Sequence, residues 1–392
     1  MITVIDSPCG AGKTTWAIKY MRMNPNKKFV YLTPYLSEVD RISKEIPTMC
    51  VPMRKTDTKG KYYNFKELLS SQESIVSTHA LFSLADLDVC ELIKAGGYTL
   101  IMDEVMEVIK QDYLTKDDLG VLNDSTRVTI DKDGKISWVK DKYNKGQFDY
   151  LKIKCESWSL YKQTDTEVFW TFPEGVLKAF SDVFVLTYMF DCQLQRCYFD
   201  LYKLQYTVKS VNKGNIVDYK AEQIDLSKLH ILDDINYNNI GDDKYSLSKS
   251  WYEKQKANMV KSLQNKVYGY IRNTIRAKSN DVMWTTFIDY KGRLKGKGYT
   301  RGFISCNSRA TNEYANRHCL VYTINRFISP PLKKFLSSHN LKLDEDYWAA
   351  SELIQFICRS AIRNGEDVYL YLPSKRMRDI IHYYKLGYGI SF

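Results

Sequence analysis

The sequence predicts an α/β protein with mostly parallel sheets, divided into two lobes. The chain has 392 residues, which at roughly 100–200 residues per domain indicates about two or three domains. Short apolar, β-rich runs alternate with longer polar-periodic stretches, the pattern of parallel strands connected by helices. Hydrophobic residues make up 44% and aromatic residues 14%, which is ample for buried cores and too much for a disordered chain.

The first lobe is expected to span residues 1–205. Its short apolar runs predict strands that are buried on both faces, at residues 3–6, 29–33, 74–77, 99–102 and 183–187. From about residue 114 to residue 163 the chain becomes more charged, and Asp131-Lys132-Asp133-Gly134 has the composition of a hairpin turn. We therefore expect an insertion in this part of the lobe.

The second lobe is expected to span residues 251–392. Residues 206–250 lack strong periodicity and are rich in Asn, Asp and Lys, so we expect them to connect the two lobes. A long helical pattern follows over residues 251–278. Further strands are predicted at 282–288, 303–306, 320–322 and 368–372, and further helices at 350–363 and 374–384.

The charge balance favours a polyanionic partner. The chain has 57 Lys+Arg against 46 Asp+Glu, a net charge of +11, so nucleic acid is the first candidate and an acidic membrane the second. Its 9 cysteines are scattered without a Cys-x-x-Cys pair, which supports neither a disulfide framework nor a zinc site. No apolar run approaches the ~18 residues of a membrane span, and no signal-peptide pattern is found. We expect a cytoplasmic protein.

The strongest motif is a phosphate loop. Residues 7–14, Ser-Pro-Cys-Gly-Ala-Gly-Lys-Thr, stand between a predicted strand and a helical run, although Ser7 replaces the usual leading Gly. In such a loop backbone N–H groups surround phosphate oxygens, Lys13 reaches the β- and γ-phosphates, and Thr14 offers a hydroxyl to Mg²⁺. The alternative is a Gly-rich turn. The expected ATP-binding residues are Pro8, Cys9, Gly10, Ala11, Gly12, Lys13, Thr14 and Thr15.

A second motif, Asp103-Glu104, ends the apolar run at residues 99–102. In a phosphate-loop enzyme the acid at this strand end holds Mg²⁺, and the following Glu orients and activates the attacking water. The alternative is a solvated Asp-Glu pair. Together with the phosphate loop, the pair favours ATP hydrolysis, with Asp103 and Thr14 on the metal and Glu104 on water.

Further short motifs appear in the order found in superfamily 1 and 2 helicases. Residues 29–35, a strand that ends in Thr33-Pro34, resemble motif Ia, and residues 75–79, which end in Thr78-His79, resemble motif Ib. Residues 185–189 occupy the place of motif III, although Tyr188 and Met189 depart from its usual triplet. Residues 355–363 resemble motif VI, whose Gln355, Arg359 and Arg363 would approach the γ-phosphate from the second lobe. Arg359 and Arg363 are four residues apart, a spacing that would place both on one helix face.

Over most of its length the chain resembles the small helicase-like ATPases encoded by tailed bacteriophages. The runs that carry this resemblance are 186–190, 309–314, 359–363 and 371–378. The resemblance implies two RecA-like lobes with ATP and Mg²⁺ in a cleft between them and single-stranded nucleic acid across their tops. Arg309, Thr311 and Asn312 would take the place of motif V on the nucleic acid.

A basic stretch, residues 291–301, is a further candidate for nucleic-acid contact. It carries three glycines among its cations, so it could follow a phosphate backbone closely, while Tyr290 or Tyr299 stacks on a base. The alternative is a solvated hairpin of no function. The expected phosphate contacts are Lys291, Arg293, Lys295 and Lys297, in addition to Thr33, Pro34, Thr78 and His79 of motifs Ia and Ib.

These motifs predict a nucleic-acid-stimulated ATPase of helicase superfamily 2, a DNA helicase or translocase in phage DNA replication, recombination or repair. Single-stranded or forked DNA is the expected partner, RNA is the alternative that the sequence leaves open, and phage replication proteins are candidate protein partners. The alternative is an ATP-switched nucleic-acid-binding or loading protein with little turnover. A phage protein of this kind would work in the cytoplasm of the bacterial host.

Overall fold

The computed structural model describes residues 1–54, 60–124, 126–139, 148, 151–152, 155, 159–164, 166–306 and 313–386. The chain forms two compact units, each with its own parallel sheet. The first unit comprises Met1–Ser7, Ala11–Ala221 and Ser329–Leu343, and the second comprises Pro8–Gly10, Glu222–Ile328 and Asp344–Phe392. The predicted α/β class with mostly parallel sheets is confirmed.

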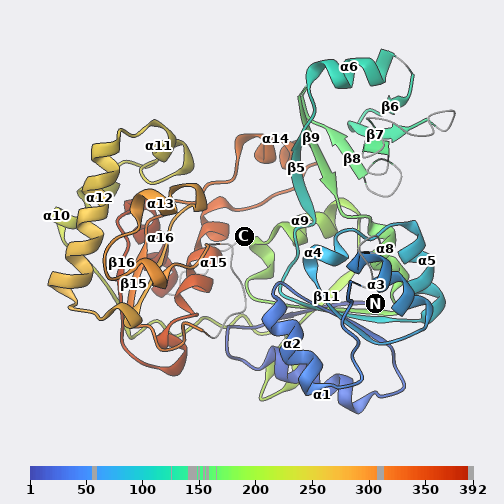
Figure 1. Cartoon of the computed structure of the whole chain (residues 1–392), viewed down its shortest axis with the longest axis horizontal. Helices are drawn as coiled ribbons and strands as arrows, with labels where there is room; N and C mark the ends of the chain where they lie inside the picture. Colours follow the sequence, from blue (N-terminus) through green and yellow to red (C-terminus); the bar gives the residue numbers. More distant parts are fainter. Residues whose placement is uncertain are drawn as a thin grey trace. The chain divides into compact units, whose positions relative to one another are not determined.

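The first unit is built on a seven-stranded sheet of order β12-β11-β1-β10-β4-β2-β3 (Figure 1). Every pair is parallel except β11 with β12. The bounds are β1 Ile2–Asp6, β2 Phe29–Thr33, β3 Ile75–Thr78, β4 Thr99–Asp103, β10 Asp182–Thr187, β11 Tyr206–Asn212 and β12 Asn215–Asp218. The five strands predicted for this lobe are confirmed to within a residue or two at each end.

Successive side chains of each central strand point to opposite faces of the sheet and belong to two separate apolar cores. Val4 of β1 and Leu100 of β4 belong to one apolar cluster, whereas the adjacent Ile5 and Ile101 belong to the other. This alternation follows from the two-residue period of a strand. Because both faces are buried, these strands are continuous apolar runs rather than alternating ones.

Helices cover both faces of this sheet. On one face lie α1 (Lys13–Met23) and α2 (Leu36–Glu45), which contribute to the cluster with Ile5 and Ile101. On the other face lie α3 (Lys61–Ser70), α5 (Leu87–Gly96), α8 (Glu174–Ala179) and α9 (Leu194–Leu201), with the one-turn α4 (His79–Phe82) after β3.

An antiparallel sheet of five strands is inserted between β4 and β10, in the order β5-β9-β8-β7-β6. Its elements are β5 Ile109–Tyr113, α6 Lys116–Asp124, β6 Val128–Ile130, β7 Lys135–Trp138, β8 Ser159–Lys162 and β9 Glu167–Thr171. The predicted hairpin turn is confirmed, because Asp131 accepts hydrogen bonds from the backbone N–H groups of Asp133 and Lys135 between β6 and β7.

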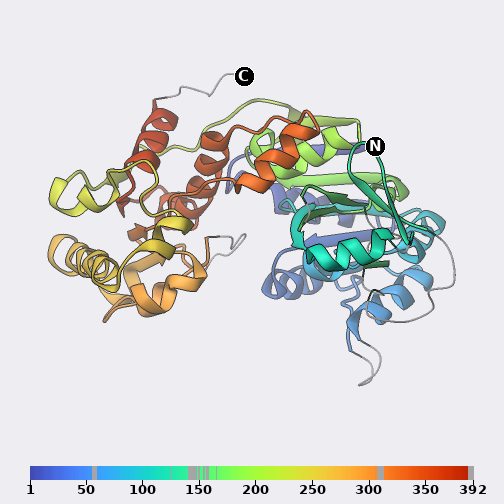
Figure 2. The same ribbon diagram turned by 90° about the horizontal axis from the view of Figure 1, so that it is seen from above.

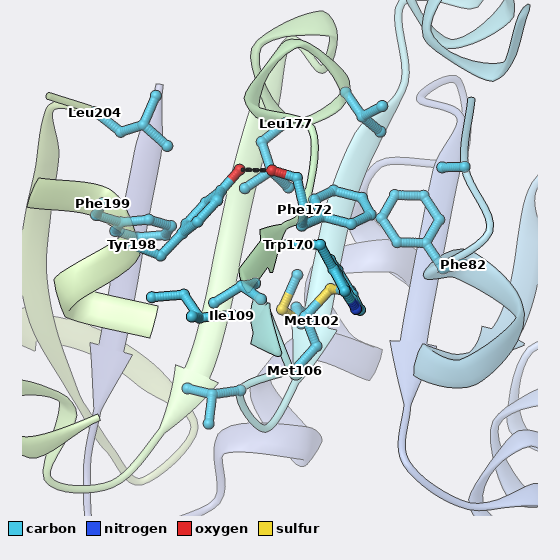
Figure 3. Close-up of a cluster of buried hydrophobic side chains, with 14 of the residues drawn as sticks. Phe82, Met102, Met106, Ile109, Trp170, Phe172, Leu177, Tyr198, Phe199 and Leu204 are labelled. Carbon is cyan, nitrogen blue, oxygen red and sulfur yellow. Dashed lines mark hydrogen bonds between the residues drawn. The ribbon is translucent and has the colours of Figure 1, made fainter. Parts of the chain in front are cut away.

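The antiparallel sheet shares an apolar core with one face of the parallel sheet. Met102 of β4, Met106 and Ile109 pack with Trp170 and other aromatic side chains, as Figure 3 shows. In the same cluster the Tyr198 hydroxyl of α9 donates to the backbone oxygen of Phe172 at 3.0 Å. The loop after Asp103 is thus enclosed between α9 and the inserted sheet.

A segment from the second half of the sequence, Ser329–Leu343, packs on this sheet and belongs to the first unit. Its helix α14 (Pro330–Ser338) lies beside β9 (Figure 1) and begins at Ser329, whose side chain accepts from the N–H of Leu332. Phe335 is fully buried and stacks on Phe169 of β9, with 4.7 Å between the ring centroids. We call residues 329–343 the strap.

The second unit has a four-stranded parallel sheet of order β13-β16-β15-β14. The strands are β13 Leu229–Ile231, β14 Val282–Thr285, β15 Cys319–Tyr322 and β16 Val368–Tyr371. Helix α12 (Ala257–Gly269), yellow in Figure 2, shares an apolar cluster with β14 and β15. The remaining helices are α10 Ile235–Asn238, α11 Lys249–Lys254, α13 Lys291–Leu294, α15 Glu345–Ile357 and α16 Lys375–Lys385.

Three elements of this half differ from the prediction. The long helix expected over 251–278 is interrupted, because Gln255 and Lys256 adopt extended backbone angles between α11 and α12. Residues 303–306 form only an isolated bridge, between Phe303 and Trp284, instead of a strand. Residues 206–250, expected only to connect the lobes, contribute strands to both sheets: β11 and β12 to the first and β13 to the second.

Replacing Phe335 by Ala should lower the free energy of unfolding of the first unit by about 3–5 kcal/mol, because it removes a fully buried aromatic ring. Urea unfolding measures the change. The exposed Lys334→Ala on the same helix is the matched control and should change stability by no more than about 0.5 kcal/mol. Equal stability of the two variants would show that the strap does not contribute to the fold of this unit.

Candidate functional site

The loop between β1 and α1 has the backbone of a phosphate-binding loop. Gly10 and Gly12 have φ values of +85° and +93°, which only glycine adopts at little cost. An added Cβ would meet nothing within 4 Å at Gly10, so the backbone conformation rather than space requires this glycine. Gly12 is the N-cap of α1, and the N–H groups in the first turn of a helix are available to an anion.

The side chains of the loop fix it to the sheet. The Lys13 ammonium is buried and donates to the backbone oxygen of Ser7 at 2.6 Å. Ser7, which stands where a glycine is usual, accepts from the N–H of Val211 through its hydroxyl at 2.8 Å, and its own N–H donates to Thr187 at 3.1 Å. The serine thereby connects the loop to β11 and β10.

Asp103, at the end of β4, lies next to the loop. The Thr14 hydroxyl donates to Asp103 Oδ2 at 3.4 Å, and the Tyr31 hydroxyl donates to the same oxygen at 2.9 Å. Burial, with the charge of Glu104 adding to it, raises the pKa of Asp103 to about 6, although Tyr31 and Lys13 act against the rise. A hydroxyl and a carboxylate at this separation are the oxygen ligands that Mg²⁺ prefers, so these residues fit the ion.

Glu104 has a left-handed backbone, with φ of +67°, which is uncommon for a residue with a side chain and is found at functional positions. Its N–H donates to the backbone oxygen of Leu186 at 2.8 Å. Two residues on, the N–H of Met106 donates to Gln195 Oε1 of α9 at 3.1 Å. The half-buried Glu104 is thus held between β10 and α9.

Asp6 is a functional candidate that the motif search did not find. Its buried carboxylate accepts from the N–H groups of Met189 and Phe190 at 2.8 and 3.0 Å, so it fixes the loop after β10. Burial raises the pKa of Asp6 to about 6, opposed by these two N–H groups and by Lys13. The sequence contains a pattern that could have identified Asp6, because Asp6 ends an apolar strand just as Asp103 does.

The candidate motif III follows β10. Met189 has φ of +58°, and the Gln193 amide donates to the backbone oxygen of Tyr188 at 3.2 Å. Tyr188 and Met189, which depart from the usual triplet, thus lie where the chain turns through the left-handed conformation of Met189. The N–H groups of Met189 and Phe190 in this turn donate to Asp6.

Residues of motifs Ia and Ib lie at the same edge of the first sheet. Thr33 of β2 and Thr78 of β3 are paired in register, and both strands end here in parallel with β1 and β4. Thr78 also caps α4 by accepting from the N–H of Leu81, and His79 is the first residue of that helix. Pro34 is half-buried beyond β2.

In the second unit, the geometry expected for motif VI is wrong. Helix α15 ends at Ile357, and Ser360 has an extended backbone, so Arg359 and Arg363 do not share a helix face. Gln355, on α15, and Arg359 are buried, whereas Arg363 is exposed in a short 3₁₀ helix. A spacing of four residues places two side chains on one helix face only within a continuous helix, and here Ser360 interrupts the helix and caps the 3₁₀ helix that follows.

The basic stretch is a packed turn and not a hairpin. Tyr299 is fully buried, donates to the backbone oxygen of Leu294, and so cannot stack on a base. A Cβ at Gly296 would lie 2.5 Å from the Tyr299 ring, so that glycine serves packing. Lys291 lies over the Phe303 ring, 4.3 Å from its centroid. The exposed cations of the stretch are Arg293, Lys295, Lys297 and Arg301.

Arg309, Thr311 and Asn312, assigned to motif V, lie outside the described residues. Within the described ranges, no three His, Cys, Asp or Glu side chains gather as a metal site would require. Among the same residues, no helix combines the length and apolar character needed to cross a bilayer.

The buried charge of Asp6 predicts a pH-dependent stability. Because its pKa is about 6 in the folded protein and 3.8 for an ordinary Asp side chain, the protonated form stabilises the native state below about pH 4, and this contribution is lost as the pH rises through 6. It is on the order of 3 kcal/mol. The difference in unfolding free energy between wild type and Asp6→Asn should therefore fall by up to this amount between about pH 4 and pH 7.

Chemical unfolding at several pH values measures this difference. Asp40→Asn, at an exposed position of α2, is the control and should show a constant difference from wild type. If the difference in unfolding free energy between wild type and Asp6→Asn is also independent of pH, burial does not raise the pKa of Asp6.

Two family models match the chain. The YonV middle domain matches residues 109–170, and the YonV C-terminal Rossmann-like domain matches residues 223–385. Among solved structures, Xpd4 of S. tokodaii is similar over 99% of this chain and 94% of its own, with 11% identity and a TM-score of 0.47. An XPD helicase is similar over the same shares, with 10% identity and a TM-score of 0.45.

A relative is similar over nearly the whole chain. The SPbeta prophage-derived uncharacterized protein YonV of Bacillus subtilis (strain 168) is 40% identical over 402 residues, which cover 97% of each chain. With this identity over nearly the whole length, the chain belongs to the YonV family.

Proposed function

We propose that this protein is a nucleic-acid-stimulated ATPase of helicase superfamily 2, a DNA helicase or translocase. One observation carries the proposal: the first turn of α1, with Lys13 and Thr14, lies beside the carboxylate of Asp103, with Glu104 next in the chain. A Gly-rich turn or a solvated Asp-Glu pair would not bring these groups together. A prophage-derived relative supports a role in phage DNA replication, recombination or repair.

In this proposal the phosphates of ATP lie on the N–H groups of the loop and of the first turn of α1. The Lys13 ammonium, which donates to Ser7, would donate to the β- and γ-phosphates instead. Thr14 and Asp103 would hold Mg²⁺. The ion, when bound, neutralises charge that develops on the phosphate oxygens.

Glu104 would orient the attacking water and accept its proton. The contacts of its backbone N–H to Leu186 and of the Met106 N–H to Gln195 fix the backbone from which this carboxylate projects. Such positioning matters because an error of about 1 Å in the reacting geometry can cost about 10²-fold in rate.

The second unit would supply Gln355, Arg359 and Arg363 to the γ-phosphate, as proposed for motif VI. A guanidinium that approaches the developing phosphoryl charge can contribute about 10³–10⁵ in rate. Arg363 is exposed whereas Arg359 is buried, so replacing Arg363 tests this role with the smaller risk to the fold.

Nucleic acid would contact the edge where Thr33, Pro34, Thr78 and His79 lie and the exposed cations Arg293, Lys295 and Lys297. Lys291, Arg309, Thr311 and Asn312 belong to the same proposal. Single-stranded or forked DNA is the proposed partner, with RNA and phage replication proteins as further partners in the cytoplasm of the host.

ATPase rates with no nucleic acid, single-stranded DNA, duplex DNA and RNA test this function, with Lys13→Ala as the inactive reference. A rate that rises with nucleic acid supports the ATPase, and unwinding of a forked duplex then distinguishes a helicase from a translocase. Nucleotide-dependent DNA binding with negligible turnover would instead support the ATP-switched loading protein. A rate equal to that of Lys13→Ala would exclude the ATPase.

Replacing Glu104 by Gln should lower ATP hydrolysis by about 10²–10⁴-fold and leave ATP binding unchanged, because the amide keeps the shape but cannot accept a proton. Steady-state hydrolysis and binding of a fluorescent ATP analogue measure the two effects. Glu107→Gln, an exposed acid three residues further along the chain, is the matched control and should hydrolyse ATP as the wild type does. Hydrolysis by Glu104→Gln at the wild-type rate would exclude this carboxylate from the mechanism.

Replacing Arg293, Lys295 and Lys297 by Gln should weaken nucleic-acid binding similarly across sequences. The slope of the salt dependence should fall by about one unit for each phosphate that the protein no longer neutralises. Fluorescence anisotropy at several salt concentrations measures both. The control removes three exposed lysines of the first unit, Lys44, Lys94 and Lys178, for the same change in net charge. Equal effects of the two triple variants would mean that net charge alone, and not this stretch, attracts nucleic acid.

A further inference from the structure

The strap contacts helix α9 as well as the inserted sheet. Near its end, the backbone oxygen of Lys342 accepts from the guanidinium of Arg196 and lies 3.6 Å from the sulfur of Cys197. Leu341 and Leu343 pack against the same apolar cluster as Phe335. The strap therefore has two attachments within the first unit, one through aromatic stacking on β9 and one through Arg196.

Arg196 is adjacent in sequence to the residue that holds the Asp103-Glu104 loop. Gln195 is almost fully buried, with 1% of its surface exposed. Its Oε1 accepts from the N–H of Met106 at 3.1 Å, and its Nε2 lies 3.4 Å from the sulfur of Met102. One amide thus contacts β4 just before Asp103 and the loop just after Glu104.

Both ends of the strap continue into the second unit. Before Ser329 that unit includes residues up to Ile328, and after Leu343 it resumes at Asp344. Asp344 caps α15 by accepting from the N–H of Tyr347, and α15 carries Gln355. The C-terminal end of the strap, which contacts Arg196 through Lys342, is thus directly followed by the cap of α15.

Arg196 fixes α9 at further points. Its Nε donates to the backbone oxygen of Asp191 at 2.8 Å, and its Nη1 donates to Asp200 at 2.6 Å. Asp191 belongs to the turn whose N–H groups bind Asp6. The same guanidinium therefore joins the strap, α9 and the loop after β10.

We propose that Gln195 is a positioning residue for Glu104 and that docking of the strap on Arg196 sets the position of Gln195. Through this relay a segment of the first unit, flanked in sequence by residues of the second unit, controls hydrolysis. The inference rests on the proposed ATPase function, because it assigns Glu104 the activation of water. It requires no contact of Gln195 with ATP.

Three variants test the relay. Gln195→Met keeps the length of the side chain and removes the acceptor of the Met106 N–H. Arg196→Ala removes the contact to Lys342, and Phe335→Leu removes the stacking on Phe169 but keeps an apolar side chain in the core. Each should lower kcat about tenfold or more and leave the KM for ATP within about twofold, because positioning acts on the chemical step.

Hydrogen exchange of the Met106 amide gives a readout that does not depend on catalysis. The rate of exchange should rise in all three variants, and in the double variant of Arg196→Ala and Gln195→Met kcat should fall less than the product of the single effects, because both act on one contact. Asp200→Asn is the control. It removes the ion pair of Arg196 on α9 and leaves the strap contact, so kcat and Met106 exchange should match the wild type.

The outcomes separate the relay from the proposed function. A wild type that hydrolyses ATP, with unchanged kcat and Met106 exchange in Arg196→Ala and Phe335→Leu, would overturn the relay and leave the ATPase standing. A wild type without ATPase activity would overturn the proposed function. Faster Met106 exchange in the three variants would still support the physical connection from the strap to the loop.

Discussion

The position of β10 between β1 and β4 is the constraint on which the first unit depends. The register pairs Asp6 with Thr187 and Leu186 with Asp103, so the phosphate loop and the acidic pair emerge one strand apart at the same edge. Parallel strands with both faces covered by helices leave their carboxyl ends as the open part of the sheet. The candidate site follows from this order.

Two buried carboxylates at this edge work against stability. Burial raises the pKa of both Asp6 and Asp103 to about 6, which means that the fold disfavours their charged forms. Each is partly compensated, Asp6 by two backbone N–H groups and Asp103 by the Tyr31 hydroxyl. A fold selected for stability alone would place apolar side chains here. The buried carboxylates, together with the left-handed Glu104, make this edge the candidate site of the first unit.

The strap joins parts of the first unit in a way that the order of elements does not reveal. Its aromatic contacts join it to an antiparallel sheet from the first half of the sequence, and its end contacts α9. Because α9 also carries Gln195, the strap, the inserted sheet and the Asp103-Glu104 loop share one apolar core. In the proposed relay, close packing in this core transmits a change in the strap to the loop.

By itself the sequence determined the local elements of the first unit and predicted the chemistry of its candidate site. The apolar runs located β1, β2, β4 and β10, because strands buried on both faces must be continuously apolar, and the glycines and Lys13-Thr14 after the first run marked the phosphate loop. Tertiary structure decided the rest. Tyr299 is buried and Arg359 is not on a shared helix face with Arg363, because packing and the cap at Ser360 override composition and spacing. Asp6, Gln195 and the strap depend on contacts between residues distant in the chain, such as Arg196 and Lys342, and no local pattern encodes such contacts.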